Sequence, residues 1–223
     1  MKESSEIPLQ ETEEKMKRRD DLKMGPRERA IEAIEAGKKV EAIRYLGELV
    51  EEFRPLHDRY GDWILSLLGF IKERLGEGAV EEALRRTFMD VYRERAFSMA
   101  KMSHEEKIKR YCQSLRSHFA EFYLEEDDEK TTIVIPYCGS GGRLEKEGKA
   151  RGRRTREAYP WSFNQKGVCY YCCHEAVFQS IYKEMGLEFI RYEYSSQFDD
   201  EGKPTGDACR WVISKERHVS PPL

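Results

Sequence analysis

The sequence contains no long apolar run, no internal repeat and no strong excess of either charge. No stretch approaches the roughly 20 consecutive apolar residues that a membrane-spanning helix needs. Residues 1–19 are charged and have no apolar core, unlike a secretory signal. The net charge is only −3, too small to draw the chain toward nucleic acid. We therefore expect a cytoplasmic protein that binds neither membranes nor nucleic acid.

Cysteine occurs at six positions in a chain of 223 residues, too few for a disulfide-rich scaffold. A chain of this length can bury a sizeable core without disulfides. In the reducing cytosol, cysteines act more often as metal ligands, nucleophiles or core residues than as disulfide partners. The positions of the six cysteines in the sequence are therefore considered as possible functional sites.

The first half of the chain has a helical pattern. From Arg27 to about Phe119, apolar residues recur at helical spacing, which predicts about five helices. Ser103 and Glu106 form a capping box that predicts the start of the last of these helices. Pro55 is expected to interrupt the helix around it.

The second half has the pattern of an antiparallel sheet with one helix. Segments 122–126 and 131–136 predict a hairpin, and the β-branched run from Thr131 to Ile135 is the strongest strand signal. Further strands are predicted at 187–194 and 208–214, and a short helix at 176–185. The predicted fold class is α+β, with an N-terminal helical layer packed on a small antiparallel sheet that carries a Cys/His site.

We expect one compact unit over residues 27–215, flanked by two tails. Its parts are a mobile or loosely helical tail at 1–26, a helical region at 27–119, an α/β region with the site at 120–215, and a second tail at 216–223.

Four candidate ligands lie within six residues, at Cys169, Cys172, Cys173 and His174. Cys169 and Cys172 have the C-x-x-C spacing with which two thiolates bind one tetrahedral ion. Cys138 follows a predicted strand and opens a Gly-rich loop, where its side chain is presented from rigid support. Mixed sulfur and nitrogen ligands favour zinc, with iron or copper as alternatives. A reactive thiol without a metal and ordinary buried cysteines are the other two interpretations.

Two residues are candidate catalytic groups. His174 is expected to transfer protons near neutral pH if it is not a ligand. Arg143 is expected to hold a substrate carboxylate, with a solvated arginine in a turn as the alternative. The Gly-rich segment lacks the Lys-Ser/Thr ending of a phosphate-binding loop, so no nucleotide cofactor is predicted. Cys209 shares a strand face with Trp211 and Ile213 and is expected to be a core residue.

The C-terminal segment from Gly206 to Ile213 resembles the closing strand of 4-vinyl-reductase-type ligand-binding domains and of the related 2-amino-thiazoline-4-carboxylate hydrolase family. The segments Tyr137–Arg143 and Tyr171–His174 resemble a group of proteins with a Pro-Cys-Gly-Ser-Gly-Gly-Arg loop and a Tyr-Cys-x-His segment. These resemblances imply a similar order of helices, hairpin, cysteine-bearing loop, helix and two strands, and leave the chemistry open.

Two functions are expected from these observations. The first is a zinc-dependent or cysteine-dependent hydrolase or lyase acting on a small polar C–N or sulfur-containing compound. The second is a sensor that binds a small molecule next to a structural metal. The expected partner is a small-molecule ligand or substrate, and a homodimer is an open alternative.

Overall fold

The computed structural model describes residues 24–215, so nearly all of the two predicted tails lies outside the described residues. The chain forms two compact units that divide between Pro55 and Leu56. This boundary falls inside a helix, and not between the helical and sheet-bearing regions expected from the sequence.

The first unit contains α1 (Pro26–Glu35) and the beginning of α2 (Lys39–Leu75). Pro26 occupies the first helical position, where its missing amide hydrogen costs nothing. Small side chains such as Ala33 are buried, whereas larger apolar ones stay exposed, and Val40 is 82% exposed.

The predicted helix break at Pro55 is wrong, because α2 is continuous over 37 residues. A proline inside a helix lacks the amide hydrogen that would bond to the carbonyl four residues earlier, and it bends or weakens the helix locally. A long helix tolerates this loss because hydrogen-bonded turns on both sides hold the backbone.

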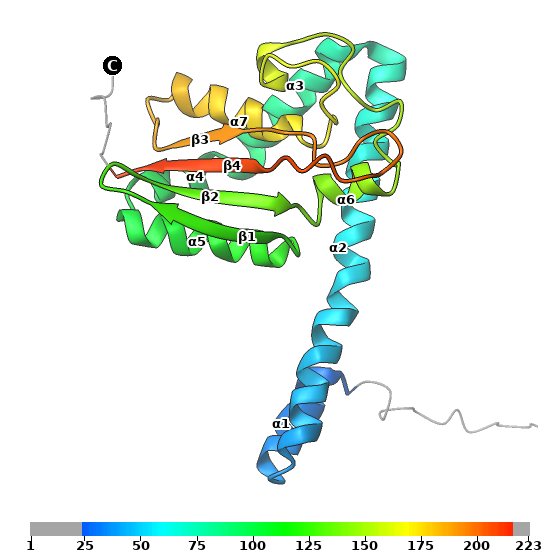
Figure 1. The fold of residues 1–223 in the computed structure, drawn as a ribbon, viewed down its shortest axis with the longest axis vertical. Helices are drawn as coiled ribbons and strands as arrows, with labels where there is room; N and C mark the ends of the chain where they lie inside the picture. The colour runs from blue at the N-terminus through cyan, green and yellow to red at the C-terminus, as the bar shows by residue number, and fades with distance from the viewer. Residues whose placement is uncertain (1–23, 216–223) are drawn as a thin grey trace, which may run out of the picture. The chain divides into compact units, whose positions relative to one another are not determined.

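The second unit holds the sheet and the candidate site (Figure 1). It continues α2 from Leu56 and adds α3 (Glu77–Thr87), the π-helical turn η2 (Phe88–Tyr92), α4 (Arg93–Ala100), α5 (His104–Ser117), β1 (Glu121–Glu126), β2 (Lys130–Tyr137), α6 (Gly141–Lys146), the 3-10 turn η3 (Pro160–Ser162), α7 (Cys173–Glu184), β3 (Ile190–Glu193) and β4 (Cys209–Ser214).

The four strands form one antiparallel sheet in the order β1-β2-β4-β3. The predicted hairpin is confirmed by β1 and β2, and the α+β fold class is confirmed by this sheet and its helices. The β-branched residues of β2 account for its central place, since Ile133 and Ile135 are almost completely buried.

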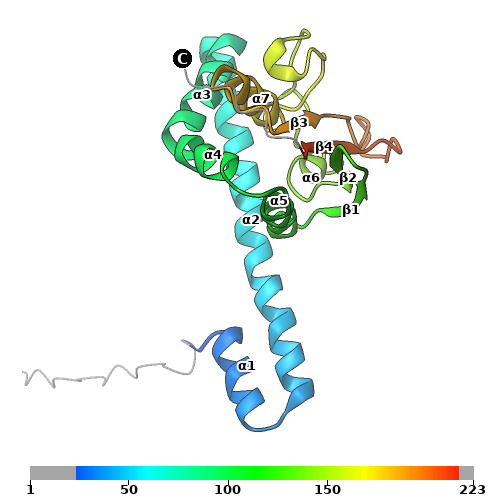
Figure 2. The same cartoon turned by 90° about the vertical axis from the view of Figure 1, so that its left-hand side faces the viewer.

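Helices of the second unit pack on this sheet, and α5 and α7 lie on the same side of it (Figure 2). Ile133 and Ile135 of β2 and Ile213 of β4 join Leu115 of α5 and Val177 of α7 in one apolar core. Alternate residues of a strand share a face, so this core fixes which side chains of β4 point toward the helices. Within residues 24–215, none of the helices combines the length and the apolar character of a membrane span.

Candidate functional site

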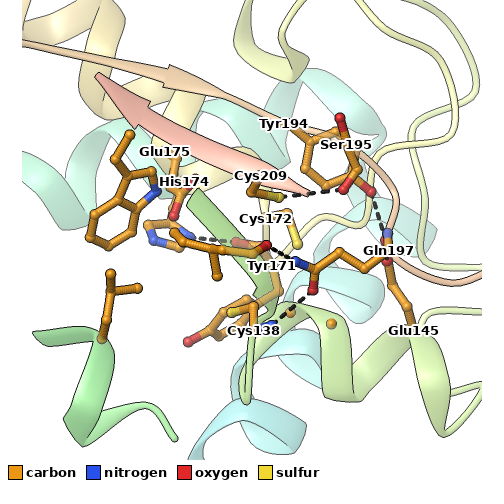
Figure 3. Close-up of a pocket in the computed structure, with 15 residues that line it drawn as sticks. Cys138, Glu145, Tyr171, Cys172, His174, Glu175, Tyr194, Ser195, Gln197 and Cys209 are labelled. Atoms are coloured by element: carbon orange, nitrogen blue, oxygen red, sulfur yellow. Dashed lines mark hydrogen bonds between the residues drawn. The ribbon is translucent and has the colours of Figure 1, made fainter. Parts of the chain in front are cut away.

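Three cysteines line one small cavity in the second unit, which we call the thiol cavity. Cys138, Cys172 and Cys209 contribute thiols to its wall, and His174 and Glu175 contribute an imidazole and a carboxyl group. Its volume is about 40 Å³, enough for about three water molecules. Figure 3 shows His174 and Glu175 on one side of the thiols. The structure therefore joins Cys138 to residues more than 30 positions away.

Cys138 follows directly on strand β2 and its sulfur accepts backbone hydrogen bonds. Burial raises the pKa of the Cys138 thiol, and amide N–H groups of Gly142, Ser140 and Gly141 partly offset that rise. The Cys138 amide donates to Gln197 Oε1 over 2.8 Å, and Gln197 Nε2 donates to the Ile135 carbonyl over 2.6 Å. The thiol is thus neutral at rest, and donors are already in place to stabilise its thiolate.

The glycines of this loop are required by close packing. A Cβ at Gly139 would overlap the His118 carbonyl oxygen, one at Gly141 would overlap Cys172 Sγ, and one at Gly142 would overlap the side chain of Gln197. The sequence predicted a loop here, but the chain turns into the short helix α6. Small residues at these positions allow the second thiol to approach the first.

Arg143 does not line the thiol cavity, which corrects the expectation that it holds a substrate carboxylate. Its guanidinium is buried and bonds to Asp58, Asp62 and Glu147, with nitrogen–oxygen distances of 3.2, 2.8 and 2.7 Å. Burial by itself would raise the pKa of Asp62, but hydrogen bonds from Lys149 and Arg143 lower it. The guanidinium is already neutralised by carboxylates of the chain, so it anchors the Gly-rich loop to α2.

Ser140 provides a second anchor through a chain of hydrogen bonds. His57 Nδ1 lies 2.9 Å from Asp58 Oδ1, and His57 Nε2 lies 2.9 Å from Ser140 Oγ. His118 Nδ1 lies 2.8 Å from the same Oγ. Because a carboxylate only accepts, His57 donates to Asp58, Ser140 donates to His57, and His118 donates to Ser140.

The connectivity of Asp58, His57 and Ser140 is that of a Ser-His-Asp triad, but the serine is in the wrong environment for a nucleophile. Ser140 is only 3% exposed and does not line the thiol cavity. Burial, followed by the neighbouring imidazoles of His57 and His174, lowers the pKa of His118 to about 4. His118 is therefore neutral at pH 7, and the network positions the loop that carries Cys138.

His174 and Glu175 lie in the first turn of α7, which begins three residues earlier than predicted. His174 Nδ1 lies 2.6 Å from the Tyr171 carbonyl oxygen, so it carries the hydrogen and leaves Nε2 as the basic atom. Burial lowers the pKa of His174 and raises that of Glu175 to about 7. The Trp211 indole opposes the shift of Glu175, although its Nε1 forms no hydrogen bond of ordinary geometry within the described chain.

The remaining predicted ligands face away from the thiol cavity. Cys169 and Cys173 are completely buried and are not part of its wall. The Cys172 thiol hydrogen-bonds to Cys169 sulfur, which lowers the pKa of Cys169 and raises that of Cys172. Cys172 therefore faces both its C-x-x-C partner and the cavity, whereas Cys173 packs in the core.

Cys209 and Glu175 are among the wall residues that sequence reasoning did not assign to the site. Cys209, expected in the core, is half-buried on the cavity, and its Sγ lies 3.4 Å from the Ser195 carbonyl oxygen. Glu175 gave no signal, because an acidic residue early in a helix is ordinary. The resemblance of the segment from Gly206 to Ile213 to the closing strand of ligand-binding domains was the available hint to Cys209.

No group of three or more His, Cys, Asp or Glu side chains has metal-binding geometry anywhere in residues 24–215. Comparison of the chain with protein-family models, with curated proteins and with solved structures finds no match. The fold and the site therefore define the class as an α+β protein with a buried thiol and carboxyl cavity.

Proposed function

We propose that the protein is a cysteine-dependent enzyme of the hydrolase or lyase type, acting on a small polar compound with a C–N or C–S bond. The observation that supports this most is the Cys138 sulfur among three backbone donors, on a cavity that also holds Glu175. A thiol, a proton-transferring acid and oriented amides are the parts that acyl or imidoyl transfer needs.

The proposed hydrolytic reaction divides into two steps. Ionised Glu175 takes the Cys138 proton, and the thiolate sulfur forms a bond to the electrophilic carbon. Glu175 then returns the proton to the departing nitrogen or sulfur as its bond to carbon breaks. Water attacks the resulting thioester or thioimidate and releases the thiol. His174 Nε2 is a second base on the same wall.

Chemical modification tests whether Cys138 is the accessible nucleophile. Brief treatment with iodoacetamide should modify Cys138 before Cys112 and Cys173, which do not line the cavity. Because burial raises the pKa of the Cys138 thiol, the rate should rise about tenfold for each pH unit between pH 7 and 9. Peptide mass spectrometry measures both results.

Turnover provides the second measurement. In a panel of small cyclic amides, amidines and thiazolines, Cys138→Ser should lower kcat/KM for any hydrolysed compound by more than about 10³-fold. Cys112→Ser is the matched control and should retain turnover. Full activity of Cys138→Ser, or an alkylation order in which Cys112 comes first, would contradict the proposal.

Zinc binding is the second candidate. Cys138, Cys172 and Cys209 surround one cavity, and the hydrogen bond from His174 Nδ1 to Tyr171 leaves Nε2 in the tautomer that binds metals. Such thiolate and imidazole donors suit zinc, which would act as a Lewis acid or hold the loops together. Because no described group has metal-binding geometry, the side chains would have to rotate to bind it.

Metal analysis decides between the two candidates. If zinc is bound, the purified protein should contain about one equivalent, and Cys172→Ser should lose most of it. Cys173→Ser, a buried cysteine outside the cavity, is the matched control. Less than about a tenth of an equivalent after dialysis against zinc would leave the metal-free thiol mechanism.

A further inference from the structure

A second cavity opens from the same residues and is large enough to hold the body of a substrate. It shares His174, Glu175 and Trp211 with the thiol cavity, and its volume is about 160 Å³. This is room for about ten water molecules, against about three in the thiol cavity. A substrate that reaches both cavities past these three side chains could place its reacting group beside Cys138 and its body in the second cavity.

Aromatic rings from four elements form the walls of this second cavity, which we call the aromatic box. They are Tyr111 of α5, Phe178 and Tyr182 of α7, Tyr192 of β3 and Trp211 of β4. The Trp211 ring meets Tyr111 and Tyr192 edge to face, with centroids 5.6 and 5.5 Å apart. All but the half-buried Trp211 are buried, so their positions are fixed by core packing.

The charges around the aromatic box favour a cation inside it. Glu175 is the one acidic side chain among the described residues of its wall, and its half-buried position limits the screening of its field by water. Arg95 on the same wall acts on the Tyr111 and Tyr182 hydroxyls. Its side chain is exposed, so solvent weakens its field more than that of Glu175.

Two buried donors in the aromatic box lack an acceptor. Tyr111 Oη and Trp211 Nε1 are inaccessible to water and form no hydrogen bond of ordinary geometry within residues 24–215. Each has a neighbour within reach of a weak hydrogen bond, the Tyr192 hydroxyl for Tyr111 and the Glu175 carboxyl for Trp211. Buried donors are nearly always satisfied, so an acceptor oxygen on a bound molecule would be a good partner once these side chains turn toward the cavity.

We propose that the aromatic box binds a small organic cation. The ammonium or amidinium group of this cation lies between the aromatic faces and Glu175. A hydroxyl or carbonyl oxygen of the same molecule faces Tyr111 and Trp211. Aromatic faces attract such cations through their quadrupoles, and a half-buried carboxylate adds direct charge complementarity. The identification of the cation as the substrate rests on the proposed function. Binding of the cation does not depend on Cys138.

Titration calorimetry with three probes tests the charge requirement on the wild-type protein. Choline carries the cation and a hydroxyl, 3,3-dimethyl-1-butanol is its neutral isostere, and acetate is a small anion. We expect choline to bind at least about tenfold more tightly than the neutral isostere. Equal affinities, binding of acetate alone, or no heat from choline at millimolar concentration would overturn the proposal.

Substitution of Glu175 tests whether its carboxylate is responsible for the preference for a cation. Glu175→Gln should reduce the preference for choline to less than about twofold, whereas Glu184→Gln, an exposed residue of the same helix, should keep it. Cys138→Ser should also bind choline as the wild type does. If the protein binds choline but Cys138 proves unreactive, the proposed reaction is refuted and the cation site stands. If Cys138 is reactive but choline does not bind, the cation site is refuted and the proposed reaction stands.

Discussion

Replacing Gly139 with alanine should lower the free energy of unfolding by about 3 kcal/mol or more. The added Cβ would overlap the His118 carbonyl oxygen and would lie 2.9 Å from the Phe119 carbonyl oxygen. Backbone atoms cannot rotate away as a flexible side chain can. Phe119 also has a positive φ of 53°, so the segment that would have to move is already conformationally restricted.

Urea denaturation of Gly139→Ala measures this loss, with Gly78→Ala as the matched control. Gly78 lies within α3, and a Cβ there would contact nothing within 4 Å. Alanine is the better helix former, so the control should gain up to about 1 kcal/mol. A loss below about 1 kcal/mol in Gly139→Ala would show that the loop and the end of α5 are not packed as described.

Arg143→Met should lower the free energy of unfolding by about 2–3 kcal/mol. The methionine keeps the apolar part of the side chain but removes the guanidinium from Asp58, Asp62 and Glu147. Within the described part of the chain, only Lys149 then remains as the ion-pair partner of Asp62 and Glu147. Losing one partner of a fully buried ion pair costs about 3–5 kcal/mol. The expected loss is smaller because these three carboxylates are 30–41% exposed and water screens part of the repulsion.

An exposed ion pair provides the control for Arg143. Arg86 and Asp90 are also four residues apart on a helix, with a nitrogen–oxygen distance of 2.8 Å, but the Arg86 side chain is 77% exposed. Arg86→Met should therefore change stability by less than about 0.5 kcal/mol. If both variants lost equally little, Arg143 would be available for a ligand, as its position in the motif first suggested.

The two stability predictions assign a role to the Cys-Gly-Ser-Gly-Gly-Arg segment. Ser140 and Arg143 attach it to His57, Asp58 and Asp62 of α2, and Cys138 at its other end faces the thiol cavity. A loop held at two points positions a reactive side chain more exactly than a free loop does. The conspicuous polar residues of the motif are thus structural, and the cysteine is the candidate functional residue.

Local patterns were sufficient for much of the fold. The β-branched run from Thr131 to Ile135 predicted β2, and the Ser103–Glu106 capping box predicted the start of α5, where both reciprocal hydrogen bonds are present. These signals depend on residues a few positions apart, so the sequence displays them directly. Pro55 misled because its local effect is real but too small to end a long helix.

The candidate site was predictable only in its residue types. Sequence reasoning selected Cys138, Cys172 and His174, which the cavity does bring together, and also Cys169 and Cys173, which face elsewhere. Neighbouring residues in a tight turn point in different directions, and the periodicity of the chain does not reveal which of them faces the sheet. The choice among adjacent cysteines was therefore made by the packing of α7.

The sequence by itself determined most of the secondary structure, the α+β class and the concentration of thiols, because each follows from local propensity or composition. The tertiary structure alone decided that Arg143 is neutralised by Asp58 and Asp62, more than 80 positions away, and that Glu175 lies beside Trp211 of β4. Charge and burial depend on neighbours brought together by folding, so the roles of these groups appear only once the chain is packed.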